Sequence, residues 1–220
     1  MGTITRSLAN NITTNGVILP TGITNASVAD VTSFANASGG TLILLSTQTA
    51  SSSASLSFTS GIDSTYDSYV FKFIDMHPQN VNVDFQFNLS TDGGSNYNVT
   101  KTSTSFRVGH REDDGGTLFN YDSGNHLAQS TAYQKLIGTN MGNDNDMSVS
   151  GYLQIFNPSS TTFVKHYIAT NNSPTSDASP YVITLYVAGY GNTTSAINAI
   201  RFQMSSGNID DGIIKMYGVL

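Results

Sequence analysis

The 220-residue sequence contains no cysteine and no tryptophan, and only 11% of its residues are charged. The absence of cysteine excludes disulfide bonds and thiolate metal sites, so burial and backbone hydrogen bonding must hold the fold. The low charge, well under the usual value of about 25%, requires a surface built from serine, threonine, asparagine, glutamine and glycine. Such a surface suits a protein that is immobilised in an assembly, because uncharged hydrogen bonds are screened little by salt.

Basic residues are also scarce, with nine Lys and Arg against a net charge of −6. Because they are scattered and form no stripe that could follow a phosphate backbone, we expect no binding to nucleic acid. No apolar run reaches the length of a membrane span, so we expect no membrane insertion. The opening residues MGTITRSLANNITTNG lack the apolar core of a signal peptide.

Residues 1–40 differ in pattern from the rest of the chain. Neither a helical nor a strand period persists there, and Pro20 and repeated glycines interrupt it further. The segment is too poor in contiguous apolar surface to fold alone. It is nevertheless too apolar for an idle linker, with Val17, Ile18, Leu19, Ile23, Val28, Val31 and Phe34. We therefore predict an N-terminal anchoring arm over residues 1–40 that is ordered against other chains, with a disordered tail as the alternative.

Residues 41–220 carry repeated strand patterns separated by turn residues. The spacing predicts an all-β domain, an antiparallel β-sandwich of jelly-roll type with about ten strands. The continuous apolar run TLILLSTQTA (41–50) predicts a buried strand. The alternation in VNVDFQFNLS (81–90) predicts Val81, Val83, Phe85, Phe87 and Leu89 on the buried face and Asn82, Asp84, Gln86 and Asn88 outside. Further strands are expected in YDSYVFKFIDM, SVSGYLQIF, TTFVKHYIAT, YVITLYVAGY and NAIRFQMSS.

Two features suggest how the strands connect. Gly93 and Gly94 favour a tight turn, because glycine readily adopts positive φ, and YNVTKTSTSFRV (97–108) is then expected as the returning strand. The apolar segment GIIKMYGV (212–219) predicts a strand that is buried on both sides or central in a sheet. We expect it to pair with the first strand of the domain, TLILLSTQ.

Two acidic loops are the candidate metal sites, since hard cations prefer several oxygen ligands. The segment GHREDDGG (109–116) offers His110, Glu112, Asp113 and Asp114. The segment MGNDNDMS (141–148) offers Asn143, Asp144, Asn145 and Asp146. The first contains the opposing Arg111, and neither has the spacing of a known calcium loop, so solvated loops are the favoured interpretation. We predict no metal site and no cofactor.

No catalytic pattern emerges from the remaining residues. The four histidines, His77, His110, His126 and His166, form neither an HxH nor an HExxH arrangement. No motif nominates a nucleophile with its base or a pair of placed carboxylates. We therefore predict no catalytic residues and no enzymatic activity, and we expect His166 to face solvent or a neighbouring chain.

Three segments carry a resemblance to a known group of proteins. They are GGTLILLSTQTASSSASLSFTSGIDSTYDSYVFKFIDMHP (39–78), FQFNLSTDGGSNYNVTKTSTSF (85–106) and SAINAIRFQMSSGNIDDGIIKMYGVL (195–220). They resemble virion structural proteins, of fibre or decoration type, from marine tailed phages such as cyanophages and pelagiphages. The arm segment ITNASVADVTSF (23–34) is similar to N-terminal segments of phage fibre-like proteins. The resemblance covers most of the chain from Thr41 onward, and it implies a surface-exposed β-sandwich on the virion.

We interpret the chain as a non-enzymatic virion structural protein, displayed on the particle surface as a fibre, a knob or a capsid decoration. Its expected partners are other phage virion proteins of the capsid or tail, reached through the arm, and further copies of itself, since repetition supplies avidity. One alternative is a tail-associated adhesin for a host surface glycan, with exposed aromatic residues at one end such as Tyr97, Phe119, Tyr121 and Tyr133. An outer alternative is a carbohydrate-binding or carbohydrate-active β-sandwich unrelated to virions.

Overall fold

A computed structural model describes residues 12–13, 16–17, 42–138, 141–176 and 179–219. The chain divides into two units, residues 1–39 and 40–220. In the first unit, the short strands β1 (Ile12–Thr13) and β2 (Gly16–Val17) pair antiparallel. The remainder of the expected anchoring arm lies outside the described residues, so the arm stays a prediction.

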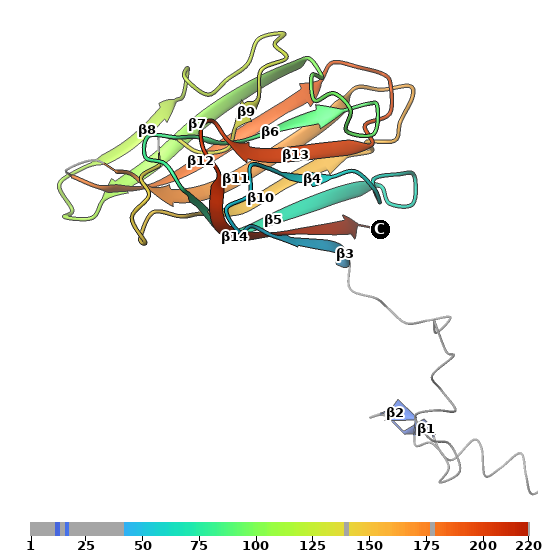
Figure 1. Cartoon of the computed structure of the whole chain (residues 1–220), viewed down its shortest axis with the longest axis horizontal. Coiled ribbons are helices and arrows are strands. Elements are labelled where there is room, and N and C mark those ends of the chain that lie inside the picture. The colour runs from blue at the N-terminus through green and yellow to red at the C-terminus, as the bar shows by residue number, and fades with distance from the viewer. Residues whose placement is uncertain (1–11, 14–15, 18–41, 139–140, 177–178, 220) are drawn as a thin grey trace, which may run out of the picture. The chain divides into compact units, whose positions relative to one another are not determined.

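The second unit consists of two antiparallel sheets, and no helix occurs among its described residues (Figure 1). The larger sheet has eight strands in the order β3 (Leu42–Thr49), β14 (Ile209–Val219), β5 (Ser68–Pro78), β10 (Val149–Phe156), β11 (Lys165–Pro174), β12 (Tyr181–Gly191), β7 (Lys101–Arg111) and β8 (Thr117–Tyr121). The smaller sheet has four strands in the order β4 (Leu56–Phe58), β13 (Ala199–Met204), β6 (Phe85–Ser90) and β9 (Gln134–Lys135). The all-β prediction is confirmed, and the arrangement is consistent with a β-sandwich.

Aromatic side chains from both sheets meet in the core. Phe202 of β13 is fully buried, and five phenylalanine rings lie around it with centroid distances of 5.1 to 6.3 Å. They are Phe58, Phe71, Phe73, Phe85 and Phe87. Because two of them project from β5 in the larger sheet, the cluster joins the sheets. Such ring pairs contribute about 0.5–1.5 kcal/mol each beyond the burial of their area.

The strand β14 lies inside the larger sheet, between β3 and β5. It pairs with β3 from Ile213 to Val219, which confirms the predicted partner of the C-terminal strand. Its inward side chains Ile209, Ile214 and Met216 are buried, whereas the side chains on its other face are half-buried. The strand therefore completes the core from one face and is not buried on both.

The first strand of the domain is not the buried strand that its apolar run predicts. β3 is an edge strand with only β14 beside it, and Leu44 is 52% exposed. Its leucines at positions 42 and 44 stand opposite Val219 and Tyr217 on the outer face of the sheet. The apolar run is continuous because apolar residues occupy both faces of β3. A strand that is buried on both faces would show the same sequence pattern.

The predicted hairpin after β6 is also wrong. The tight turn forms as expected, with φ of 70° at Gly93 and 91° at Gly94. The chain then leaves the smaller sheet, because β7 pairs with β12 and β8 in the larger one, while β6 pairs with β13 and β9. Alternation shows which face of a strand is buried, but it does not identify the strand's partner.

Two residues of the segment 81–90 depart from the predicted pattern of burial. Val81 is 56% exposed, because Asn82 adopts a φ of 58° and breaks the alternation before β6 begins. Asn88, expected outside, is fully buried. The predicted inward residues Val83, Phe85, Phe87 and Leu89 are all buried, so the predicted inner face is correct.

Candidate interaction surface

The outer face of the eight-stranded sheet gathers exposed apolar side chains. Residues that stand opposite each other in an antiparallel pair share a face, so the strand registers assign each side chain to the inner or outer side. All but two of the exposed large hydrophobic side chains of the described residues lie on the outer side. They are Leu42, Leu44, Ile74, Phe106, Phe119, Tyr121, Tyr152, Phe156, Ile168, Val182 and Tyr186. The two exceptions, Val81 and Phe163, lie in loops.

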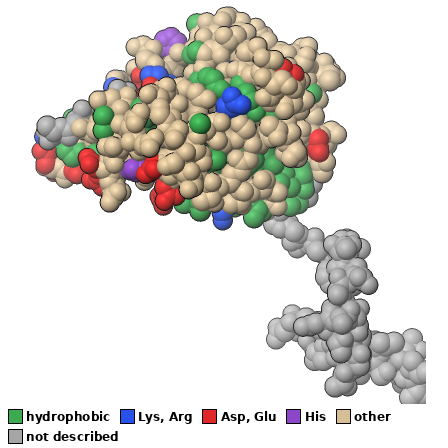
Figure 2. Space-filling view, in the orientation of Figure 1, with side chains coloured by type: hydrophobic (Ala, Val, Ile, Leu, Met, Phe, Trp, Pro, Cys, Tyr) green, Lys and Arg blue, Asp and Glu red, His purple; other side chains and the backbone are tan. Residues whose placement is uncertain are grey.

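The outer face of the four-stranded sheet is polar by comparison. It presents Ser57, Gln86, Arg201 and Gln203, which pair across β4, β13 and β6. This sheet is drawn in front of the larger one in Figure 1, and in the same orientation Figure 2 shows mainly uncharged polar side chains and backbone, with few charged groups. The two sheets therefore offer surfaces of different chemistry.

Carboxylates are absent from much of the apolar face. The strands β7, β8, β10, β11 and β12, which are neighbours in the larger sheet, contain no Asp or Glu, although the chain has 15. The cations of the face, Lys72 and Lys215, stand opposite each other on β5 and β14, outside this group. Aromatic enrichment and depletion of charge are typical of the core of a protein interface.

This carboxylate-free region contains a hollow of about 570 Å³ beside a ridge of aromatic rings. The hollow is lined by Thr102, Ser103, Thr104, Phe156, His166, Tyr167, Ile168, Ala188, Gly189 and Tyr190. We define the aromatic ridge as Phe106, Phe119, Tyr121 and Tyr186. Within the ridge, the Phe106 ring is 4.7 Å from Tyr186 and 5.8 Å from Phe119, which is 76% exposed. Residues of β12 and β7 contribute to both features, so the ridge and the hollow are adjacent.

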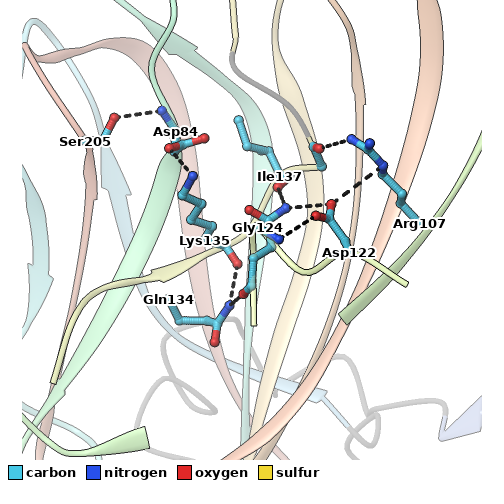
Figure 3. Close-up of polar contacts among 10 residues, drawn as sticks. Asp84, Arg107, Asp122, Gly124, Gln134, Lys135, Ile137 and Ser205 are labelled. Carbon is cyan, nitrogen blue, oxygen red and sulfur yellow. Dashed lines mark hydrogen bonds and ion pairs between the residues drawn. The ribbon is translucent and has the colours of Figure 1, made fainter. Parts of the chain in front are cut away.

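A polar network supports the strand that carries part of the ridge (Figure 3). The inner side of β7 is covered by the segment 122–138: Arg107 donates a hydrogen bond to the Gly138 carbonyl at 2.5 Å and lies 3.7 Å from Asp122. Buried Gln134 accepts a bond from Ser103 at 2.6 Å and donates one to the Asn125 carbonyl at 2.7 Å. Because these buried polar groups are hydrogen-bonded to one another, the network can fix the position of β7 beside the apolar core residues Leu136 and Ile137 of the same segment.

The first acidic loop, GHREDDGG, forms the turn between β7 and β8. His110 lies 2.9 Å from Asp114, and Arg111 lies 2.6 Å from Asp113. The backbone N–H of Gly115, helped by the Arg111 guanidinium, holds the pKa of the Asp113 carboxyl below its usual value. Two of the loop's three carboxylates are thus engaged with neighbours in the same turn.

The second acidic loop, MGNDNDMS, approaches a polar hollow at one end of β5 and β14. This hollow, also about 570 Å³, is lined by Ile74, Asp75, His77, Asn145, Ser148, Asp210, Asp211, Gly212 and Ile213. The Asp144 carbonyl lies 3.1 Å from His77 Nε2. Nevertheless, no group of three or more His, Asp or Glu suited to a metal ion occurs among the described residues.

One side of the polar hollow brings a serine, an aspartate and a histidine together, which sequence reasoning did not anticipate. Ser52 donates a hydrogen bond to Asp210 at 3.2 Å, and the other oxygen of Asp210 lies 3.8 Å from His77 Nδ1. In a hydrolytic triad the histidine stands between the hydroxyl and the carboxylate. Here the carboxylate stands in the middle, so the histidine is not in position to deprotonate the serine.

Two lysines are buried, which the sequence pattern also did not reveal. Lys101 and Lys165 both stand opposite Gly191, on the two sides of β12, and both are fully buried. Lys101 donates to the side-chain oxygen of Asn88 and to the Val99 carbonyl, and burial lowers the pKa of its amine to about 7. Burial also lowers the pKa of Lys165. Because both lysines are buried, we expect their amines to affect the stability of the fold and not to contact a substrate.

The aromatic residues that the adhesin alternative would gather at one end do not form one exposed group. Phe119 and Tyr121 are exposed on β8 and belong to the ridge. Tyr97 is half-buried, with the Arg201 guanidinium 4.0 Å above its ring, and Tyr133 is also half-buried. His166, which we predicted to face solvent or a neighbouring chain, is exposed and lies beside Tyr190 at the hollow.

Comparison of the chain with protein-family models, with curated proteins and with solved structures finds no match. Among the described residues there is also no helix long and apolar enough to cross a membrane. The chemistry of the surface itself therefore carries the functional argument.

Proposed function

We propose that the chain is a non-enzymatic structural protein of a bacteriophage virion, displayed on the particle surface as a fibre, a knob or a capsid decoration. The observation that carries the proposal is the gathering of exposed apolar side chains on one sheet face. Monomeric soluble proteins rarely expose a contiguous apolar patch of this kind, and such patches mark interaction sites. A protein of an assembly needs such a surface, whereas a freely diffusing enzyme does not.

The polar clusters favour binding over catalysis. Two of the three acids of the β7–β8 turn are engaged with His110 and Arg111. The order of Ser52, Asp210 and His77 is unsuited to nucleophilic attack. The candidate site is thus a surface that can exclude water and pack against a partner, without an activated nucleophile or a placed acid and base.

We also infer that the sandwich is of jelly-roll type. Eight of its strands follow the paired orders β3-β14-β5-β10 and β4-β13-β6-β9, in which the chain crosses repeatedly between the sheets. These orders correspond to the two interleaved Greek keys of a jelly roll. The remaining strands β7, β8, β11 and β12 extend the larger sheet beyond the smaller one, and the aromatic ridge lies on this extension.

Jelly rolls serve as both viral capsid and lectin domains, so the fold supports the virion proposal by analogy alone. The same analogy keeps a second candidate, a tail-associated adhesin for a host surface glycan. The observation that favours the adhesin is the hollow, where the rings of Phe156 and Tyr190 accompany the hydroxyls of Thr102 and Thr104. Few convergent polar groups in an apolar depression are typical of small-ligand sites.

Attachment through the N-terminal arm is part of the proposal and can be tested on particles of the phage that encodes the chain. The full chain, a variant lacking residues 1–40 and the full-length Ile168→Glu variant would be tagged and added to particles lacking the native protein. We expect the full chain and Ile168→Glu to decorate particles, and the armless variant to remain soluble with β-type circular dichroism but unbound.

Other outcomes separate the alternatives. Normal decoration by the armless variant would refute the arm as the anchor. Loss of decoration with Ile168→Glu would assign the contact to the sheet face. Binding of the full chain to host cells, with competition by a soluble host glycan and no binding to particle heads, would replace the decoration proposal with the adhesin.

A further inference from the structure

We propose that the apolar outer face of the eight-stranded sheet binds the same face of a second copy of this chain, around a two-fold axis. The proposal concerns the region formed by β10, β11, β12, β7 and β8, with its hollow and aromatic ridge. The dimer proposal does not depend on whether the protein belongs to a virion. Either proposal can therefore fail while the other stands.

The size of the region is sufficient for a stable dimer. Five strands spaced about 4.8 Å apart span about 24 Å, and strands of about nine residues extend about 30 Å. The projected area is therefore about 700 Å² before the relief of the side chains is added. A standard interface buries about 800 Å² on each partner. The region is thus large enough without any contribution from β3, β14 or β5.

The charge pattern favours a second copy over other occupants. Two copies of an acidic chain repel each other wherever their carboxylates face, and this chain has a net charge of −6. The five strands of the region contain no Asp or Glu, and the three carboxylates of the β7–β8 turn lie at its end, so face-to-face contact over the strands avoids most of that repulsion. The two lysines of the face, Lys72 and Lys215, lie on β5 and β14 and remain outside the contact.

The relief of the region is self-complementary. An isologous dimer uses one patch twice, so each projection needs a matching depression beside it on the same surface. The ridge supplies the projection, with Phe119 as its most exposed member, and the adjacent hollow supplies the depression. A two-fold axis between them would place the ridge of each copy in the hollow of the other. Buried aromatic anchors of this kind dominate the affinity of interfaces.

The experiment measures the mass of the full chain in solution by sedimentation velocity and by light scattering, over a range of protein concentrations. We expect the wild type to be a dimer that dissociates on dilution. Ile168→Glu places one carboxylate from each copy in the apolar contact and should weaken association at least about tenfold. Its matched control is Val81→Glu, because Val81 is similarly exposed, at 56% against 46% for Ile168, but lies in a loop away from the face.

A second pair of variants tests the ridge without adding charge. Phe119→Ala should weaken the dimer, whereas Phe163→Ala, which removes a loop phenylalanine of similar exposure, 70% against 76%, should not. Circular dichroism and cooperative unfolding confirm that each variant is folded. A wild type that stays monomeric at its highest soluble concentration would overturn the proposal. An oligomer that Ile168→Glu leaves intact would also overturn it, because association would then use another surface. A monomer whose apolar face binds a different virion protein would overturn it as well.

Discussion

The two outer faces of the sandwich differ in how far loops of the same chain cover them. On the smaller sheet, buried Asn88 donates hydrogen bonds to the carbonyls of Tyr97 and Thr131, which lie in loops folded back over the strands. Arg201 lies beneath the Tyr97 ring in the same way. The larger sheet keeps its rings exposed over β7, β8 and β12, although the ring of the loop residue His126 lies 5.6 Å from that of Tyr121. The chain covers part of its polar face with its own loops and leaves the apolar side chains of the other face exposed.

If the inner faces alone hold the fold, then substitutions at two neighbouring residues of β6 should show the largest difference in stability. Phe87 is fully buried and its ring lies 5.2 Å from Tyr167 of the other sheet. Phe87→Ala should lower the free energy of unfolding by about 3–5 kcal/mol, since it leaves a cavity between the sheets. Gln86→Ala, on the outer face, should cost under about 1 kcal/mol in urea titrations. Equal losses would show that the smaller sheet is buried on both sides.

Asn88 is an exception on the outer face of the smaller sheet, because its side chain is fully buried there. Its side chain accepts hydrogen bonds from Lys101 and from the Leu89 N–H and donates two others. Asn88→Ala should cost about 1–3 kcal/mol, because it leaves buried partners unsatisfied. Gln203→Ala on the same face is the control, and it should change the denaturation midpoint little. A neutral Asn88→Ala would mean that solvent reaches this part of the loop cover.

The amine held by Asn88 predicts an unusual dependence of stability on pH. An unfolded chain keeps a lysine proton up to about pH 10.4, whereas burial lowers the pKa of folded Lys101 to about 7. Between these values the unfolded state binds more protons, so stability should rise as pH increases from about 7 to about 10. Thermal midpoints at several pH values measure the slope. Lys101→Met should flatten this slope.

Much of the fold was predictable, because alternation marks buried faces. Phe85 and Phe87 were placed correctly, and the C-terminal strand was paired with its correct neighbour. Strand partners across sheets were not predictable, since β6 and β7 adjoin in sequence but lie in different sheets. The run in β3 was misread as burial because Leu42 and Leu44 occupy an outer face that is itself apolar.

The candidate site was predictable only in part, for a related reason. The adhesin alternative names Phe119 and Tyr121 among exposed aromatic residues at one end of the sandwich, but the sequence does not predict that they lie on the outer face of β8. Their neighbours Phe106 and Tyr186 join them only through the pairing of β7 with β8 and β12. Buried Lys101 could not be found either, because the lysine in KTSTSFRV shows the same alternation as a solvent-facing one.

The smallest expected effect tests whether the apolar face serves association and not folding. Ile168→Glu changes an exposed side chain, so it should alter the stability of the monomer by less than about 0.5 kcal/mol.

Binding that is specific for the folded state raises its stability by mass action, so the thermal midpoint of a dimer depends on concentration. For a domain of this size, each 1 kcal/mol of association free energy should raise the midpoint by about 2–4 °C. Calorimetry of the wild type and of Val81→Glu should therefore show a midpoint that climbs with concentration, while Ile168→Glu gives the same midpoint at every concentration. If all three midpoints are independent of concentration, the contrast between the faces does not arise from pairing of two copies. If Ile168→Glu is unfolded at every concentration, the outer face contributes to the fold itself. The claim that this face serves association and not folding would then be wrong.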